Sequence, residues 1–135
     1  MELIYPMFMM VILTIIVGVL MPYKRIKSAY AGELDQRYFR LMSKYEISEN
    51  IEKYGRNFDN LFEVPVLFYA AGICALSINV MSQSLLVFMW AFVIIRIVHT
   101  VIHLTYNNPL HRFIPFILSL FCVLGLWINI IVLVN

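Results

Sequence analysis

Ionisable and amide side chains recur at a helical spacing in the stretch RNFDNLFEVP. Arg56, Asp59, Asn60 and Glu63 stand at positions i, i+3, i+4 and i+7. Because successive residues of an α-helix are turned by about 100°, these side chains form a polar stripe on one helix face. The arginine in such a stripe can donate paired hydrogen bonds to a carboxylate.

A second polar stripe follows in the stretch RIVHTVIHLTYNNPLHR. Arg96, His99 and His103 fall within about 60° of one another on a helix, and Asn107 joins them if the helix continues that far. Ionisable groups inside a membrane cost about 2.5–3.5 kcal/mol each, so they normally face a partner helix or a wet cavity. Near the membrane edge, cationic or titratable donors outnumber carboxylates. The donors are Arg56, Arg96, Arg112, His99, His103 and His111, and the carboxylates are those of Asp59 and Glu63. This excess predicts an anionic ligand.

Two other interpretations use the same side chains. Glu63 and Arg96 could form a purely structural ion pair that holds two helices together. His99 and His103, at i and i+4, could share a metal ion, with His111 as a third ligand. Nearby arginines repel a cation, and neither a cysteine nor a carboxylate pair stands beside these histidines, so we expect no metal site.

The elements that must position these residues are membrane helices. The chain has 135 residues, of which 62% are hydrophobic and only 13% charged, whereas about 45–50% of an ordinary soluble domain is apolar. Four apolar stretches each approach the roughly 20 residues that a helix needs to cross a bilayer. We therefore expect an all-α, polytopic four-helix membrane bundle that forms one domain over residues 1–135. Its helices are predicted at about residues 3–22, 57–80, 83–106 and 112–134.

The segments between these helices carry turn and breaker signals. Pro22 is expected to end the first helix, and Gly55 to separate the polar connection at about 23–56 from the second helix. Asn107-Asn108-Pro109 predicts the turn between the last two helices. An amphipathic helix at the membrane surface is predicted by the apolar spacing of Tyr38, Leu41, Met42 and Tyr45.

The basic residues are concentrated in one connection. Eight of the ten lysines and arginines lie in the segment 23–56, which the positive-inside rule places in the cytoplasm, with both termini on the opposite side. They alternate with acidic residues, so no nucleic-acid partner is expected. Ala29-Tyr30-Ala31 imitates a signal-peptide cleavage site, but the basic residues follow the apolar run instead of preceding it. We expect a retained first helix and a multi-pass protein of a bacterial inner membrane.

Two motifs carry a resemblance to a known family. The first, R-x-x-x-N-x-x-E followed by proline, is matched by Arg56, Asn60, Glu63 and Pro65; the second, R-x-x-H-T-x-x-(Y/H)-L with a further arginine after a loop, is matched by Arg96, His99, Thr100, His103, Leu104 and Arg112. Together with four apolar helices, these motifs resemble the membrane-associated proteins in eicosanoid and glutathione metabolism, the MAPEG family. Within that family, the chain resembles microsomal glutathione transferase-like members.

The resemblance implies a homotrimer that binds glutathione between neighbouring subunits near the cytoplasmic side. Glutathione would be held by Arg56, Asn60, Glu63, Arg96, His99 and His103. Arg112 would face its sulfur as the catalytic residue, and one of Lys24, Arg25 or Lys27 would contribute from the end of the first helix.

The activity implied by the resemblance is a glutathione-dependent transferase or peroxidase that acts on lipophilic electrophiles in the membrane. The alternative is a non-catalytic lipid-binding or scaffolding protein of the same fold. Three departures from the family pattern bear on this choice. His103 replaces a common tyrosine, Phe113 replaces the serine of the prostaglandin synthase, and Pro65 lies closer to Glu63 than in the eukaryotic enzymes.

Overall fold

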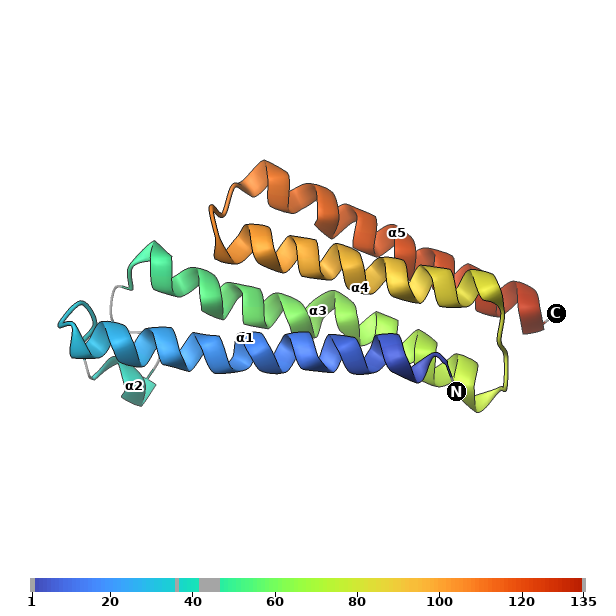
Figure 1. The fold of residues 1–135 in the computed structure, drawn as a ribbon, viewed down its shortest axis with the longest axis horizontal. Coiled ribbons are helices and arrows are strands. Elements are labelled where there is room, and N and C mark those ends of the chain that lie inside the picture. The colour runs from blue at the N-terminus through green and yellow to red at the C-terminus, as the bar shows by residue number, and fades with distance from the viewer. Residues whose placement is uncertain (1, 36, 42–46, 135) are drawn as a thin grey trace.

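The computed structural model describes residues 2–35, 37–41 and 47–134. The described residues form helices and no strand; the helices are α1 (Ile4–Tyr30), α2 (Tyr38–Leu41), α3 (Glu49–Ser77), α4 (Gln83–Leu104) and α5 (Pro109–Val134). The four long helices lie side by side as a bundle (Figure 1). The prediction of an all-α fold with four long apolar helices is confirmed.

Each long helix is long and apolar enough to cross a membrane. With 27 and 29 residues, α1 and α3 are about 40 Å and 44 Å long, which exceeds the roughly 30 Å of a hydrocarbon core. Figure 1 shows both helices reaching past α4 and α5 at the end that carries α2. We call this end, formed by the last turns of α1, the first turns of α3 and the α4–α5 loop, the basic end.

The first helix does not end at Pro22, as the sequence had indicated. Pro22 lies inside α1, which continues to Tyr30. A proline removes a single backbone donor, and a helix at the membrane tolerates this loss because its other backbone groups have no better partner than the helix itself. The basic residues that follow Pro22 therefore extend from the bundle on a helix and not on a loop.

The second long helix starts earlier than predicted, at Glu49 and not at residue 57. Glu49 and Glu52 occupy its first turn, where negative charges stabilise the positive end of the helix dipole. Gly55 lies inside α3 and breaks nothing. A Cβ atom there would lie 2.7 Å from Nη2 of Arg25, so the glycine makes room for the arginine of α1. The connection between the long helices thus shrinks from 23–56 to 31–48.

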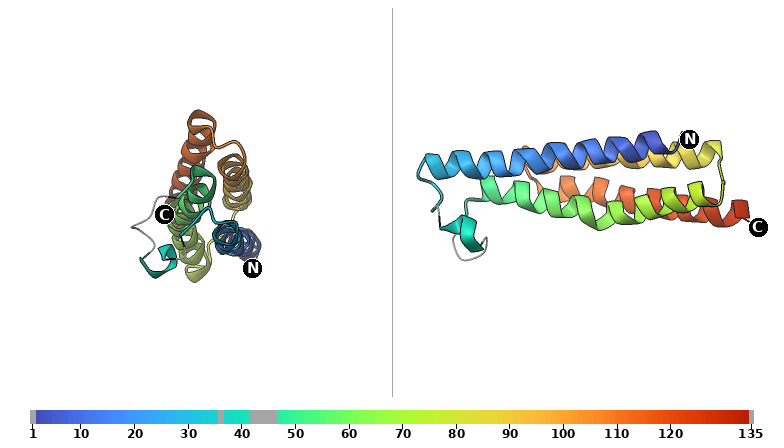
Figure 2. Two further views of the ribbon diagram at one scale, coloured as in Figure 1. Left: turned by 90° about the vertical axis from the view of Figure 1, so that its left-hand side faces the viewer. Right: turned by 90° about the horizontal axis from the view of Figure 1, so that it is seen from below.

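Helices α3 and α4 form the centre of the bundle, because each of them contacts the other three long helices. The end-on view of Figure 2 shows the same arrangement. The buried face of α3 continues through the membrane with Leu61, Val64, Phe68, Ala71 and Ala75. The rings of Phe68 and Phe92 are stacked, with centroids 4.4 Å apart and an interplanar angle of 9°. This packing fixes the rotation of α3 and α4 about their axes.

Helices α4 and α5 pack closely at the end opposite the basic end. A Cβ atom added to Gly125 would lie only 2.7 Å from the ring of Phe88. Nearby, the Ser84 hydroxyl donates a 2.5 Å hydrogen bond to Oδ1 of Asn129. A rigid ring in a glycine notch and an interhelical hydrogen bond join the two helices there.

The turn at Asn107-Asn108-Pro109 is confirmed: α4 ends at Leu104, two residues before the predicted end, and α5 begins at Pro109. Oδ1 of Asn108 accepts hydrogen bonds from the backbone N–H groups of Leu110 and His111 at 3.0 and 3.3 Å, which satisfies donors in the first turn of α5.

Of the predicted surface helix, α2 covers Tyr38–Leu41, and Tyr38 is buried. Met42 and Tyr45 lie outside the described residues. The Tyr38 side chain reaches the end of α1, where the Arg25 guanidinium lies 5.6 Å from the tyrosine ring centroid.

Candidate functional site

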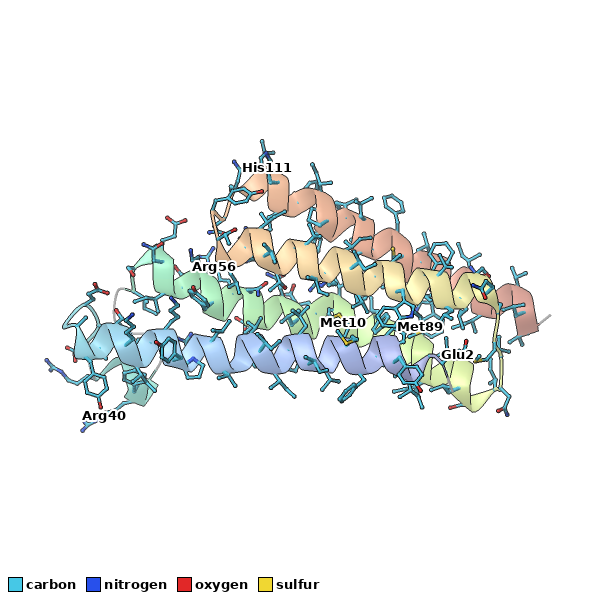
Figure 3. All side chains as sticks on the ribbon, in the orientation of Figure 1. Glu2, Met10, Arg40, Arg56, Met89 and His111 are labelled. Atoms are coloured by element: carbon cyan, nitrogen blue, oxygen red, sulfur yellow. The ribbon has the colours of Figure 1, made fainter. Side chains whose placement is uncertain are left out.

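A cleft of about 310 Å³ opens at the basic end, between the first turns of α3 and the α4–α5 loop. It is lined by Glu49, Glu52, Lys53, Arg56, Asn107, Pro109 and Arg112. Of the seven predicted site residues, Arg56 and Arg112 line this cleft. Figure 3 labels Arg56 on α3, near the ends of α4 and α5, and His111 at the start of α5.

Arg56 is held by a carboxylate of its own helix. Its Nη2 and Nε donate to Oε1 of Glu52 at 2.9 and 3.1 Å, and 64% of its side chain is exposed. An exposed i,i+4 ion pair contributes only about 0.3–0.5 kcal/mol. A carboxylate of a ligand can therefore replace Glu52 on the guanidinium at little cost.

Arg112 is oriented by two side chains. Its Nη1 contacts Nε2 of His103 and donates to Oδ1 of Asn107, each at 3.0 Å. Because a guanidinium only donates, Nε2 of His103 must accept and be unprotonated. Among the described residues, Nη1 is the only guanidinium nitrogen of Arg112 with a hydrogen-bond partner, which leaves Nε and Nη2 for a ligand.

The side chain of His99 contacts the backbone of the same arginine. Its Nδ1 lies 3.0 Å from the carbonyl oxygen of Arg112. A carbonyl only accepts, so Nδ1 is the protonated nitrogen. His99 and His103 are both buried, and they form a layer directly behind Arg112. In the single chain both histidines contact Arg112, and their contact with glutathione stays a prediction.

Arg96 lies deeper and points into the bundle. Its side chain is fully buried, and Nη2 donates to the backbone carbonyl oxygen of Asn60. Its Nε and Nη1 have no hydrogen-bond partner in the described part of the chain. No ion pair within 4.0 Å joins Arg96 to Glu63 among the described residues. Arg96 thus forms a polar layer below the cleft instead of lining it.

Asn60 and Glu63 lie on the outer side of α3. Asn60 is half-buried and donates from Nδ2 to the backbone oxygen of Arg56 at 3.0 Å, while Glu63 is exposed. The stripe predicted on this helix therefore exists, but in a single chain most of it faces away from the stripe on α4. Only Arg56 turns into the cleft.

Two residues that line the cleft, Lys53 and Asn107, and one buried residue beside Arg56, Asn57, were not predicted or were assigned elsewhere. Asn57 is fully buried, and both atoms of its amide lack a partner among the described residues. It continues the buried face of α3 one turn beyond Leu61, a spacing that could have identified it. Lys53 donates from Nζ to the carbonyl oxygen of Thr105 at 2.9 Å and so ties α3 to the loop. Asn107 belongs to that loop and not to the helical stripe.

The structure also places the basic residues at the end of α1. Arg25 packs within its own chain against Gly55 and Tyr38. Lys24 and Lys27 line a separate cleft of about 320 Å³ between α1 and α3, where Nζ of Lys24 lies 5.6 Å from the ring centroid of Tyr54. Of the three basic candidates at the end of α1, Lys24 and Lys27 therefore line a cleft, and Arg25 does not line it.

The histidines do not converge on one point. The rings of His99 and His103 have centroids 5.8 Å apart, but Nδ1 of His111 contacts the Tyr106 hydroxyl at 3.1 Å on the other side of α5. In the described ranges, no group of three histidine, cysteine or acidic side chains is placed to hold a metal ion.

Comparison with known proteins agrees with the motifs and the helices. The model of the MAPEG family matches residues 3–132, which is nearly the whole chain. No curated protein and no solved structure matches the chain significantly. Four membrane-spanning helices, the two motifs in order and this family match lead to one conclusion: the chain is an integral, multi-pass membrane protein that belongs to the MAPEG family.

Proposed function

We propose that this protein is a glutathione-dependent transferase or peroxidase that acts on lipophilic electrophiles at the membrane surface. The observation that carries the proposal is Arg112, whose guanidinium is oriented by His103 and Asn107 while two of its nitrogens stay available in the cleft. Membership in a family of glutathione and eicosanoid metabolism supports the same choice.

The charges of the cleft complement those of glutathione, which has two carboxylates and one ammonium group. Arg56 and Lys53 can bind carboxylates, and Glu49 and Glu52 can bind the ammonium group. A volume of about 310 Å³ is at the lower limit of ligand pockets. A second subunit against the outer stripe of α3 would enlarge and close the site.

Arg112 stabilises the thiolate, which is the reactive form of the glutathione thiol. A free thiol has a pKa near 8.5, so only a few per cent is thiolate at neutral pH. A guanidinium beside the sulfur lowers that pKa, and each unit corresponds to about 1.4 kcal/mol. The thiol proton passes to water, and the thiolate sulfur then bonds to the electrophilic carbon of a substrate dissolved in the bilayer while a leaving group such as halide departs with its bonding pair. In the peroxidase reaction, two glutathiones supply the two electrons that reduce a hydroperoxide to an alcohol and water, and they become glutathione disulfide.

We further propose a homotrimer with the outer stripe of α3 at each subunit boundary. Asn60 and Glu63 lie on the outer side of α3 in the single chain. Polar and ionisable groups within a membrane normally face a partner helix or a water-filled cavity. Lys24 or Lys27 of a neighbouring subunit can supply a further cation. Native mass spectrometry in nanodiscs tests the assembly: a trimer is expected, and a stable monomer would contradict it.

The proposed activity is tested by two arginine variants. Arg112→Ala should raise the pKa of bound glutathione and reduce turnover more than affinity, because the lost interaction is with the reacting sulfur. Arg56→Ala should mainly weaken binding, by about 1.5–3 kcal/mol. Glutathione affinity, thiolate absorbance and turnover with a generic aromatic electrophile are measured for both variants and the parent. Equal, small losses in all three quantities would refute the assigned roles.

One observation favours the alternative, a non-catalytic lipid-binding or scaffolding protein. A groove of about 440 Å³ runs along the outer side of α4 and α5, lined mainly by apolar residues such as Ile94, Val98, Ile114 and Leu118. Tight glutathione binding without any thiolate signal in the parent, or lipid retained in place of glutathione, would favour this alternative.

A further inference from the structure

We infer that Asn107 is a positioning residue that aims Arg112 at the sulfur of glutathione, an inference that rests on the proposed function. Asn107 lies in the loop between α4 and α5, outside both helices. Its Oδ1 accepts a hydrogen bond from Nη1 of Arg112 at 3.0 Å. It is therefore one of the two side chains that determine where this guanidinium points.

The backbone of Asn107 has a left-handed conformation, and in this conformation its side chain reaches Arg112. Its φ is +50°, a value that asparagine tolerates better than most residues. Its N–H donates to the carbonyl oxygen of Ile102 at 2.9 Å, which closes the end of α4. Non-glycine residues in this region cluster at functional sites, where the surroundings hold them in place.

The other half of the amide is tied to α3. Because Oδ1 accepts from Arg112, the Nδ2 group points elsewhere, and it donates to Oε1 of Glu49 at 3.4 Å. Lys53 holds the same loop through the carbonyl oxygen of Thr105. Asn107 thus joins the first turn of α3 to the first turn of α5, and the position of Arg112 depends on both helices.

Without the amide, Nη1 of Arg112 keeps only its contact with His103. A long side chain held at one point explores several rotamers, so the guanidinium is less often beside the sulfur. The expected defect is specific: the pKa of bound glutathione rises, kcat falls, and KM for glutathione changes little, because Arg56 and Lys53 still bind the carboxylates.

A glycine variant separates this role from a purely structural one. Asn107→Gly keeps the left-handed backbone and removes only the amide, and Asn107→Ala removes the amide and also strains the backbone. Asn79, which has φ of +54° in the loop at the opposite end, provides the matched control Asn79→Gly. Each variant is purified as the full chain, and thiolate absorbance is titrated against pH together with kcat and KM.

We expect Asn107→Gly to move the pKa of bound glutathione toward that of free thiol and to lower kcat by about 10- to 100-fold, as a misplacement near 1 Å does. Asn79→Gly should match the parent. If Asn107→Gly also matches the parent while Arg112→Ala loses the thiolate, the proposed function stands and this inference is refuted. A lower kcat with an unchanged thiolate pKa refutes it too. Absence of bound thiolate in the parent refutes both.

Discussion

Replacing Arg96 with methionine should make the protein more resistant to unfolding. The guanidinium is fully buried, and two of its nitrogens have no partner among the described residues. Each unsatisfied buried donor costs about 1–3 kcal/mol, and the one hydrogen bond to Asn60 returns about 1.5–3 kcal/mol. Methionine fills similar space without polar atoms, so we expect a net stabilisation of about 1–3 kcal/mol, within the range seen when buried charges are replaced.

The measurement is reversible unfolding in mixed micelles of mild detergent and dodecyl sulfate, followed by the fluorescence of Trp90 and Trp127. Arg56→Met is the matched control, because it removes an exposed guanidinium and should change the free energy of unfolding by less than about 0.5 kcal/mol. A destabilisation of Arg96→Met by more than about 1 kcal/mol would refute the reasoning. It would mean that water or a neighbouring subunit satisfies the buried guanidinium in the assembled protein.

Three further predictions concern packing, the hidden amide and orientation. Gly125→Ala should lower the free energy of unfolding by about 1–3 kcal/mol, because the added methyl group meets the rigid ring of Phe88; the same micelle assay measures it, and no loss would show that the ring moves freely. Asn57→Leu should leave the free energy of unfolding unchanged or raise it in that assay, since it removes two buried polar atoms that have no partner among the described residues. A large decrease in the free energy of unfolding would reveal a partner of the Asn57 amide. In a chain without its natural cysteines, an impermeant maleimide applied to intact cells should label Gln83→Cys but not Arg37→Cys; the reverse pattern would invert the proposed topology.

The sequence was sufficient to predict the helices because hydrophobic length dominates membrane insertion, but it could not predict where they end. Pro22 and Gly55 break helices in water, where the backbone has an alternative partner. At a membrane, helix is the cheapest state for the backbone, and Gly55 is also required for the close approach of Arg25. Local signals are therefore misleading at positions where packing or lipid decides.

The site was predicted as a set of residues but not as a geometry. The spacing of Arg56, Asn60 and Glu63 identified one helix face, yet spacing does not say whether that face meets α4 or the outside of the chain. The resemblance assigned His103 to glutathione, and spacing alone did not indicate its contact with Arg112. The role of Asn107 depends on a backbone angle in a loop, and no periodic pattern reports on such an angle.

The close packing of Phe88 on Gly125 and of Ser84 on Asn129 has a mechanical consequence for residues at the other end. These contacts hold one end of the α4–α5 hairpin, and the loop that carries Asn107, which Lys53 and Glu49 tie to α3, lies at its other end. Helix α4 has 22 residues and is about 33 Å long, so a small rotation at one end of the helix displaces the other end by a larger distance. A rotation of about 2° at the held end shifts the loop by about 1 Å, enough to lower a rate about 100-fold through misorientation. Under the proposed function, small changes of side-chain size at Phe88 or Gly125 should therefore alter turnover through the position of Arg112, without altering any residue that lines the cleft.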